Sequence, residues 1–207
     1  MITAAVLALI LLSPQQPFTQ FTYCRQNPSG SFESLCIQLD PDGNGEARFK
    51  RVDDDALRRS VTLSQSGKAQ YLSVLSATKY LADSKNYESK RKVADLGLKH
   101  LTLESASGRR EAEFNYSDLK EVSALVSFFE SLLTQEVLVV DLEWAVKFDP
   151  LGIPDRLDQI DRVMKSSRFA DPKNLTEVLD IIDRDDHIVN YARSHARELK
   201  ARLALIK

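Results

Sequence analysis

The stretch LGLKHLTLESASGRREAEFNY, residues 96–116, decides the fold class of this chain. Two runs flank the turn sequence Ser105-Ala106-Ser107-Gly108, and in the second run Ala112, Phe114 and Tyr116 alternate with polar residues. Such alternation is typical of a strand with one buried and one solvated face, so the stretch predicts a β-hairpin. We expect its strands over residues 96–104 and 109–116.

Working outward, the chain before the hairpin predicts further short strands, and the chain around and after it predicts helices with wide apolar faces. We expect strands over residues 21–25, 32–39, 46–51 and 59–63. We expect helices over residues 65–83, from Ser117 to Phe148, over 155–167, from Asp171 to about Ile182, and from about His187 to Ile206.

This order of elements predicts an α+β fold, in which antiparallel β-hairpins with packed helices precede a C-terminal all-α extension. We expect a signal peptide over residues 1–20, an α+β domain over 21–133 and a helical region over 134–207. Because the helices from Ser117 onward carry wide apolar faces, we expect the last two parts to share an interface.

The composition is that of an ordinary globular protein. The 207 residues are 43% hydrophobic, and 28 basic against 30 acidic side chains leave a formal net charge of -2. A near-neutral balance argues against a nucleic-acid binder, which usually carries a strong basic excess.

Residues 1–12 form the longest apolar run, with Thr3 as its one polar side chain. A spanning helix needs about 20 apolar residues, so this run fits the apolar core of a secretory signal better. It predicts a periplasmic or secreted protein with no stable membrane span after cleavage. The alternative is a buried N-terminal element of a cytosolic protein, which the lack of a basic residue before the run would fit.

The only two cysteines, Cys24 and Cys36, lie on either side of the turn sequence Asn27-Pro28-Ser29-Gly30. If the flanking runs form a hairpin, the two residues face each other and can form a disulfide in an oxidising compartment. The alternative is a pair of free buried thiols in a cytosolic chain.

The acidic loop at residues 40–46 resembles the first half of an EF-hand calcium loop. Its candidate metal ligands are Asp40, Asp42, Asn44 and Glu46. The second half of the pattern fails, because Arg51 stands where a bidentate Glu belongs. Calcium binding is therefore weighed here against a plain acidic turn.

The last predicted helix carries His187 and His195, eight residues apart. Residues with this spacing lie about 12 Å apart along a helix axis, so the two rings cannot share one metal ion. Surface or capping roles are the alternative to acid–base or metal chemistry. The single tryptophan, Trp144, stands among apolar residues, and packing is its default role.

The C-terminal region resembles one HEAT-type helical pair. The resemblance rests on Asp171-Pro172 and Asp185-Asp186 at the two helix starts, and on Val189, Ala192 and Ala196 on one inner face. It implies an interaction surface, and covers only this pair of helices. The whole chain resembles exported bacterial proteins of unknown function with a hairpin-helix-hairpin-helix layout, a resemblance that implies no activity.

Two functional hypotheses follow. The first is an exported, non-enzymatic binding or structural module without a cofactor, whose partner would be a protein of the cell envelope. The second is a small metal-dependent or hydrolytic enzyme that uses the loop 40–46 or the histidines of the last helix. An enzyme would need these polar groups gathered in one pocket.

Overall fold

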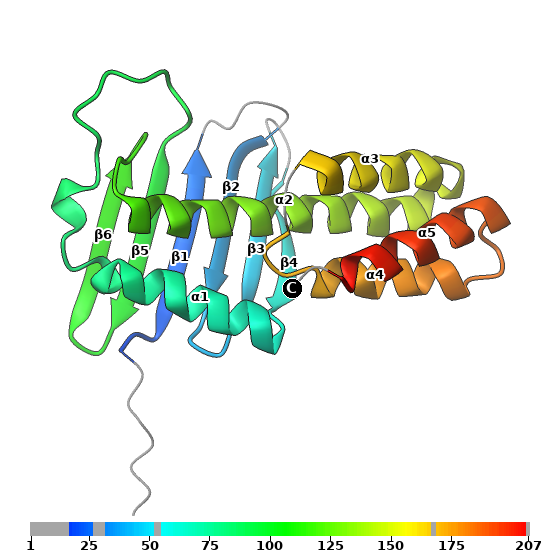
Figure 1. Ribbon diagram of the computed structural model, residues 1–207, viewed down its shortest axis with the longest axis horizontal. Helices are drawn as coiled ribbons and strands as arrows, with labels where there is room; N and C mark the ends of the chain where they lie inside the picture. The colour runs from blue at the N-terminus through cyan, green and yellow to red at the C-terminus, as the bar shows by residue number, and fades with distance from the viewer. Residues whose placement is uncertain (1–16, 27–31, 52–54, 167–168, 206–207) are drawn as a thin grey trace, which may run out of the picture.

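The structure, a computed structural model, describes residues 17–26, 32–51, 55–166 and 169–205. In this part of the chain, six antiparallel strands form one sheet in the order β4-β3-β2-β1-β5-β6, and helices cover one of its faces (Figure 1). This confirms the predicted α+β class. The strands are β1 Gln20–Gln26, β2 Phe32–Leu39, β3 Asn44–Arg51, β4 Leu57–Thr62, β5 Lys99–Ser105 and β6 Gly108–Phe114.

The helices fall into a pair on the sheet and a group beside it. The α-helices are α1 Gln65–Ala77, α2 Lys120–Phe148, α3 Ile153–Ser166, α4 Lys173–Arg184 and α5 Asn190–Leu203. Short 3-10 turns are η1 Lys79–Leu81, η2 Ser84–Asn86 and η3 Pro150–Gly152. Helices α1 and α2 cross the same sheet face, and α2 runs on past β4, where α3, α4 and α5 pack around its second half (Figure 1).

The hairpin that decides the fold class lies at one edge of the sheet. Strands β5 and β6 pair with Leu101 opposite Ala112 and with Ser105 opposite Gly108 at the turn. Gly108 has a φ of 121°, a conformation that side-chain-bearing residues rarely adopt, so the turn requires glycine there. The strands end one to three residues away from the predicted limits.

Helix α2 belongs to two hydrophobic cores. The core between the sheet, α1 and α2 includes α2 residues up to Leu133, and the core among α2 to α5 begins at Leu138. The helix is continuous between them. The predicted boundary between residues 133 and 134 thus falls inside one helix, next to Gln135 and Glu136, two polar residues with no exposed surface.

Glu136 joins three elements across this gap. Its Oε2 accepts a hydrogen bond from Arg59 Nη1 of β4 at 2.6 Å, and its Oε1 accepts one from Asn174 Nδ2 of α4 at 2.7 Å. Burial raises the pKa of the Glu136 carboxyl, and the bonds from Asn174 and Arg59 oppose that rise. The charge-assisted bonds hold the helical unit against the edge of the sheet.

Several ion pairs join α2 to the sheet, and in each of them the charges are arranged in the same way. The sheet supplies the arginines and the helix supplies the carboxylates. Arg25 Nη1 lies 2.6 Å from Glu130, and Arg51 Nη2 lies 3.8 Å from Asp141. Arg59 pairs with Glu143 at 3.1 Å as well as with Glu136. Each pair draws α2 towards the sheet, so the register of the helix on the sheet is specified by charge as well as by packing.

The predicted starts of α2, α3, α4 and α5 each differ from the observed starts by two or three residues. Helix α2 begins at Lys120, and Ser117 Oγ accepts a bond from the Leu119 N–H at 3.3 Å instead of capping the helix. Asp171 lies before α4, but its Oδ2 accepts the Ser64 N–H at 2.5 Å and so ties α4 to the start of α1. A Cβ at Gly67 would lie 2.2 Å from that oxygen, so the contact needs glycine.

Helix α1 is shorter than predicted. It ends at Ala77 rather than Asp83, because Lys79, Tyr80 and Leu81 have φ values of 51°, 52° and 58°. Consecutive left-handed residues cannot continue a right-handed α-helix. Leu81 is buried in the sheet core after this turn, which compensates part of its conformational cost.

Among the described residues, α2 is the one helix that is long and apolar enough to cross a membrane. More than half of the most apolar 18-residue stretch of this helix is buried in the structure. This burial indicates the central helix of a folded core.

We predict that Glu136→Gln lowers the free energy of unfolding by about 3 kcal/mol, because one buried donor on Arg59 or Asn174 loses its acceptor. Glu143→Gln is the matched control, since Glu143 bonds the same arginine from the same helix but is exposed. It should cost less than about 1 kcal/mol in urea denaturation. Equal losses in the two variants would contradict the role given to Glu136.

The acid stability should depend on Asp161. Hydrogen bonds from Lys165 and Arg202 lower the pKa of Asp161 from 3.8 to about 2, and Arg202 links α3 to α5. A depressed carboxyl pKa stabilises the fold above the unfolded value and stops doing so as the pH falls through the folded value. Asp161→Asn should therefore lower the thermal midpoint at pH 7, by a margin that narrows from about pH 4 towards pH 2.

The control for this series is Glu198→Gln on α5, an exposed carboxylate with no ion pair to the part of the chain that the structure describes. Its midpoint should follow that of the parent protein at each pH. A constant difference between Asp161→Asn and the parent from neutral to acid pH would contradict the assignment.

Candidate functional site

A cleft opens where the end of the sheet, α2 and α3 meet, and we call it the junction cleft. Its volume is about 500 Å³, within the range of small-molecule sites. It is lined by Phe32, Phe49, Arg51, Asp55, Leu57, Val137, Val140, Asp141, Trp144 and Arg156. These residues come from three strands, one strand connection and two helices.

Strand and helix periodicity explain why these side chains converge. Phe49 and Arg51 are two residues apart on β3, so both point to the sheet face that α2 covers. On α2, Val137, Val140 and Trp144 recur at spacings of three and four residues, so they share one stripe. The stripe faces the cleft at the point where α2 leaves the sheet. Val137 and Val140 are partly buried against the sheet core, and Trp144 is exposed.

The mouth of the cleft is aromatic and exposed. Trp144 is 52% exposed, and its ring centroid lies 5.8 Å from that of Phe148 on the next turn. Leu57, at the start of edge strand β4, is 48% exposed. Inside, the Arg51 guanidinium lies 5.3 Å from the centroid of the Phe32 ring, within cation–π range. Large apolar side chains left open to solvent beside a concavity are typical of a binding surface.

The charges inside the cleft are incompletely paired. Asp141 lies 3.8 Å from Arg51, too far for a hydrogen bond, and burial raises the pKa of its carboxyl against the opposing effects of Arg156 and Arg51. The Nε of Arg156 is buried and has no hydrogen-bond partner among the described residues. A buried guanidinium nitrogen without an acceptor costs free energy, which an oxyanion entering the cleft could recover.

The acidic loop forms a hairpin turn between β2 and β3. Asp40 Oδ1 accepts the backbone N–H groups of Asp42 at 2.8 Å and Asn44 at 2.9 Å, as in an Asx-type turn. The Asp42 carboxylate lies 2.7 Å from Lys68 Nζ, and Glu46 lies 2.6 Å from Arg48 Nε. Within the described residues, no three His, Cys, Asp or Glu side chains are grouped to hold a metal ion.

The histidines occupy separate places. His187 is exposed, and its Nδ1 lies 3.0 Å from Asp185 at the start of the α5 region. His195 is largely buried, with its Nδ1 3.7 Å from Asp158 of α3. His100 lies on β5, on the sheet face away from the helices. Neither the loop 40–46 nor any histidine lines the junction cleft, so the structure does not bring the predicted chemical groups together.

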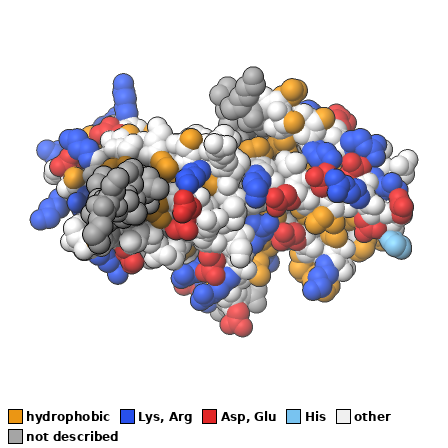
Figure 2. Space-filling view, turned by 90° about the horizontal axis from the view of Figure 1, so that it is seen from below, with side chains coloured by type: hydrophobic (Ala, Val, Ile, Leu, Met, Phe, Trp, Pro, Cys, Tyr) orange, Lys and Arg blue, Asp and Glu red, His pale blue; other side chains and the backbone are white. Residues whose placement is uncertain are grey.

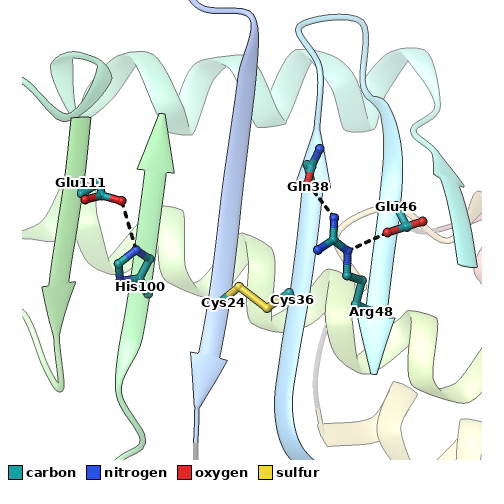
Figure 3. Close-up of a disulfide and its surroundings, with 7 residues drawn as sticks. All are labelled: Cys24, Cys36, Gln38, Glu46, Arg48, His100 and Glu111. Carbon is teal, nitrogen blue, oxygen red and sulfur yellow. Dashed lines mark hydrogen bonds and ion pairs between the residues drawn. A yellow bond between two sulfur atoms is a disulfide. The ribbon is translucent and has the colours of Figure 1, made fainter. Parts of the chain in front are cut away.

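Cys24 and Cys36 form a disulfide, as predicted from the turn between them. They are directly opposite each other on β1 and β2, on the sheet face that no helix covers (Figure 3). On one side of the disulfide, His100 Nε2 lies 3.6 Å from Glu111. On the other side, Arg48 bonds Gln38 and Glu46 (Figure 3). The open face is thus polar around a covalent link between the two central strands.

The C-terminal helices pack through two of the three residues predicted on the inner face of the last helix. Val189, the third, is exposed at the residue before α5 begins. Ala192 and Ala196 of α5 are fully buried against α4 and α3. Outside, acidic and basic side chains alternate over the helical part, on the right of Figure 2. Lys200, for example, bonds Asp180 across the α4–α5 contact.

Sequence reasoning missed the cleft. The sequence predicted a packing role for Trp144, and it identified Arg51 only as a residue that is incompatible with a calcium-binding loop. Asp141 and Arg156 received no role. The sequence of α2 did contain a signal: two aromatic residues, Trp144 and Phe148, are four residues apart and therefore lie one turn apart on the helix. The structure shows that both are exposed.

No protein-family model matches the chain, and no curated protein sequence matches it significantly.

Proposed function

We propose that this protein is an exported, non-enzymatic binding module, and that the junction cleft is its binding site. The observation that carries the proposal is the cleft itself. It combines a solvent-exposed tryptophan, apolar walls and a guanidinium with an unsatisfied nitrogen in one concavity. Its lining offers stacking surfaces and charged groups for a ligand.

Two features support an oxidising compartment. The disulfide between Cys24 and Cys36 belongs with exported proteins rather than reducing cytosol. The apolar run at residues 1–12, which lies outside the described residues, has the length of a secretory signal core. Phe18 is buried in the sheet core and the Thr19 N–H bonds the Glu104 carbonyl, so we place the end of the leader before Phe18 rather than at residue 20.

The enzymatic alternative has less support. Its candidate groups lie on different elements, and those of the loop 40–46 already bond each other's backbone or neighbouring lysine and arginine side chains. A catalytic site needs a nucleophile, base and orienting groups around one reacting atom. Within the part of the chain that the structure describes, the candidate groups do not form that arrangement.

We predict that the protein purified from its own cells carries a small molecule in the cleft. In native mass spectrometry, the mass of the protein should exceed its mass under denaturing conditions by the mass of one ligand. Val140→Phe, which fills the cleft, should lose that ligand, and Lys120→Phe at the exposed start of the same helix should keep it. A ligand-free parent protein, or a ligand equally present in Val140→Phe, would contradict the proposed site.

Export has its own test on the same preparation. The denatured mass should lack the residues before Phe18, and the thiols of Cys24 and Cys36 should react with iodoacetamide only after reduction. A mass that includes residues 1–16 together with two reactive thiols would contradict export and return the chain to a reducing compartment.

A further inference from the structure

The chemistry of the junction cleft follows from which of its charges already have partners. Along α2, the sheet arginines Arg25, Arg51 and Arg59 each lie within 4 Å of a carboxylate of the helix. Arg156 differs, because it comes from α3 and has no hydrogen bond or ion pair to any residue in the described ranges. Of the two arginines in the cleft lining, it is the one without an ion pair to a described residue.

Among the described residues, the lining of the cleft carries two arginines, Arg51 and Arg156, and two acids, Asp55 and Asp141. Asp141 lies 3.8 Å from Arg51, and the charges of both Arg156 and Arg51 lower the pKa of its carboxyl against the effect of burial. Asp55, the other acid of the lining, is exposed at the rim, where water screens its charge. The buried Nε of Arg156 has no acceptor among the described residues, so this guanidinium is the group in the lining that an added anion would satisfy.

The rest of the lining consists of aromatic and aliphatic side chains. Phe32, Phe49 and Trp144 present rings, and Leu57, Val137 and Val140 complete the walls. Trp144 presents half of its surface to solvent, so its ring can be covered by a flat ligand without displacing a protein contact. A planar ring system would bury its surface against these side chains, and a volume of about 500 Å³ accommodates a molecule of two or three rings.

We propose that the junction cleft binds an aromatic monoanion, with its oxyanion on Arg156 and its ring system against Trp144 and Phe32. This inference rests on the proposed function, because it names the ligand class of the same cleft. Arg156 binds the anionic group of the ligand, and the aromatic side chains favour a ligand with a planar ring system. A neutral ring of the same size would bind more weakly, because the guanidinium would stay without an acceptor.

The single tryptophan of the chain makes a direct experiment feasible. Trp144 lies in the cleft, so its fluorescence reports on a dye bound there by energy transfer. The probes are anilinonaphthalene sulfonate, an aromatic monoanion, and phenylnaphthylamine, the same ring skeleton without the sulfonate. Both are titrated into the parent protein, Arg156→Gln, Arg162→Gln and Val140→Phe. Arg162 is the matched control, an exposed arginine on the same helix outside the cleft.

We expect Arg156→Gln to lower the affinity for the sulfonate dye about tenfold, the usual effect of losing a charge-assisted contact at a partly exposed site. The affinity for the neutral dye should stay within about twofold of that of the parent protein. Arg162→Gln should change neither affinity, and Val140→Phe should weaken both dyes. Arg156→Gln removes no bond to a described residue, so it should fold, as circular dichroism would check.

A measurement on the parent protein needs no variant. Its affinity for the sulfonate dye should fall as salt is raised, while its affinity for the neutral dye should not. If Arg156→Gln and salt affect both dyes alike while Val140→Phe weakens both, the anionic ligand class is wrong and the cleft remains the binding site. If Val140→Phe leaves both dyes unchanged, the cleft is not the site, and the proposed function fails with the inference.

Discussion

The buried carboxylate of Glu136 is the interaction on which the arrangement of this protein depends. A fully buried charge is tolerated only when it is paired and hydrogen-bonded, and here the partners come from β4 and α4. Arg59 and Asn174 are therefore brought to the same turn of α2, which fixes the helical unit against the last strand of the sheet. Apolar packing would join these elements without specifying their relative position, whereas two directed bonds to one carboxylate specify it.

The cleft follows from this placement. Because α2 extends beyond β4 to enter the second core, it leaves the sheet at an uncovered corner, and α3 returns along one side of that corner. The α2 stripe that contains Val140 and Trp144 is only partly covered there, with Val140 half-buried against the sheet core and Trp144 exposed. A cleft held by rigid elements on three sides is preorganised for binding, since little conformational entropy is lost when a ligand enters.

Charge pairing explains how the same corner combines rigidity with a free binding group. The sheet arginines and α2 carboxylates satisfy one another and fix the helix, as Arg25 with Glu130 illustrates. Arg156, which α3 brings in from outside this series, has no such partner. On the opposite sheet face the disulfide links the two central strands covalently, so the scaffold behind the cleft remains ordered in an oxidising environment.

The sequence by itself determined the elements that depend on local periodicity. Alternation around Ala112 and Phe114 predicted the hairpin at residues 96–116, and the turn sequence at residues 27–30 indicated that Cys24 and Cys36 could pair. Both signals lie within a few residues of the contacts they predict. The apolar spacing in the second half of the chain predicted its helices for the same reason.

Tertiary structure alone decided the rest, because the deciding contacts join residues far apart in the chain. Asp171 bonds the Ser64 N–H as well as the N–H of Lys173, and the left-handed turn that ends α1 places Leu81 in the core, so local propensity misplaced both boundaries. The cleft collects residues from Phe32 to Arg156, which no local pattern can relate. Sequence periodicity identifies which faces are buried, but a binding site forms at the surface that the packing of those faces leaves uncovered.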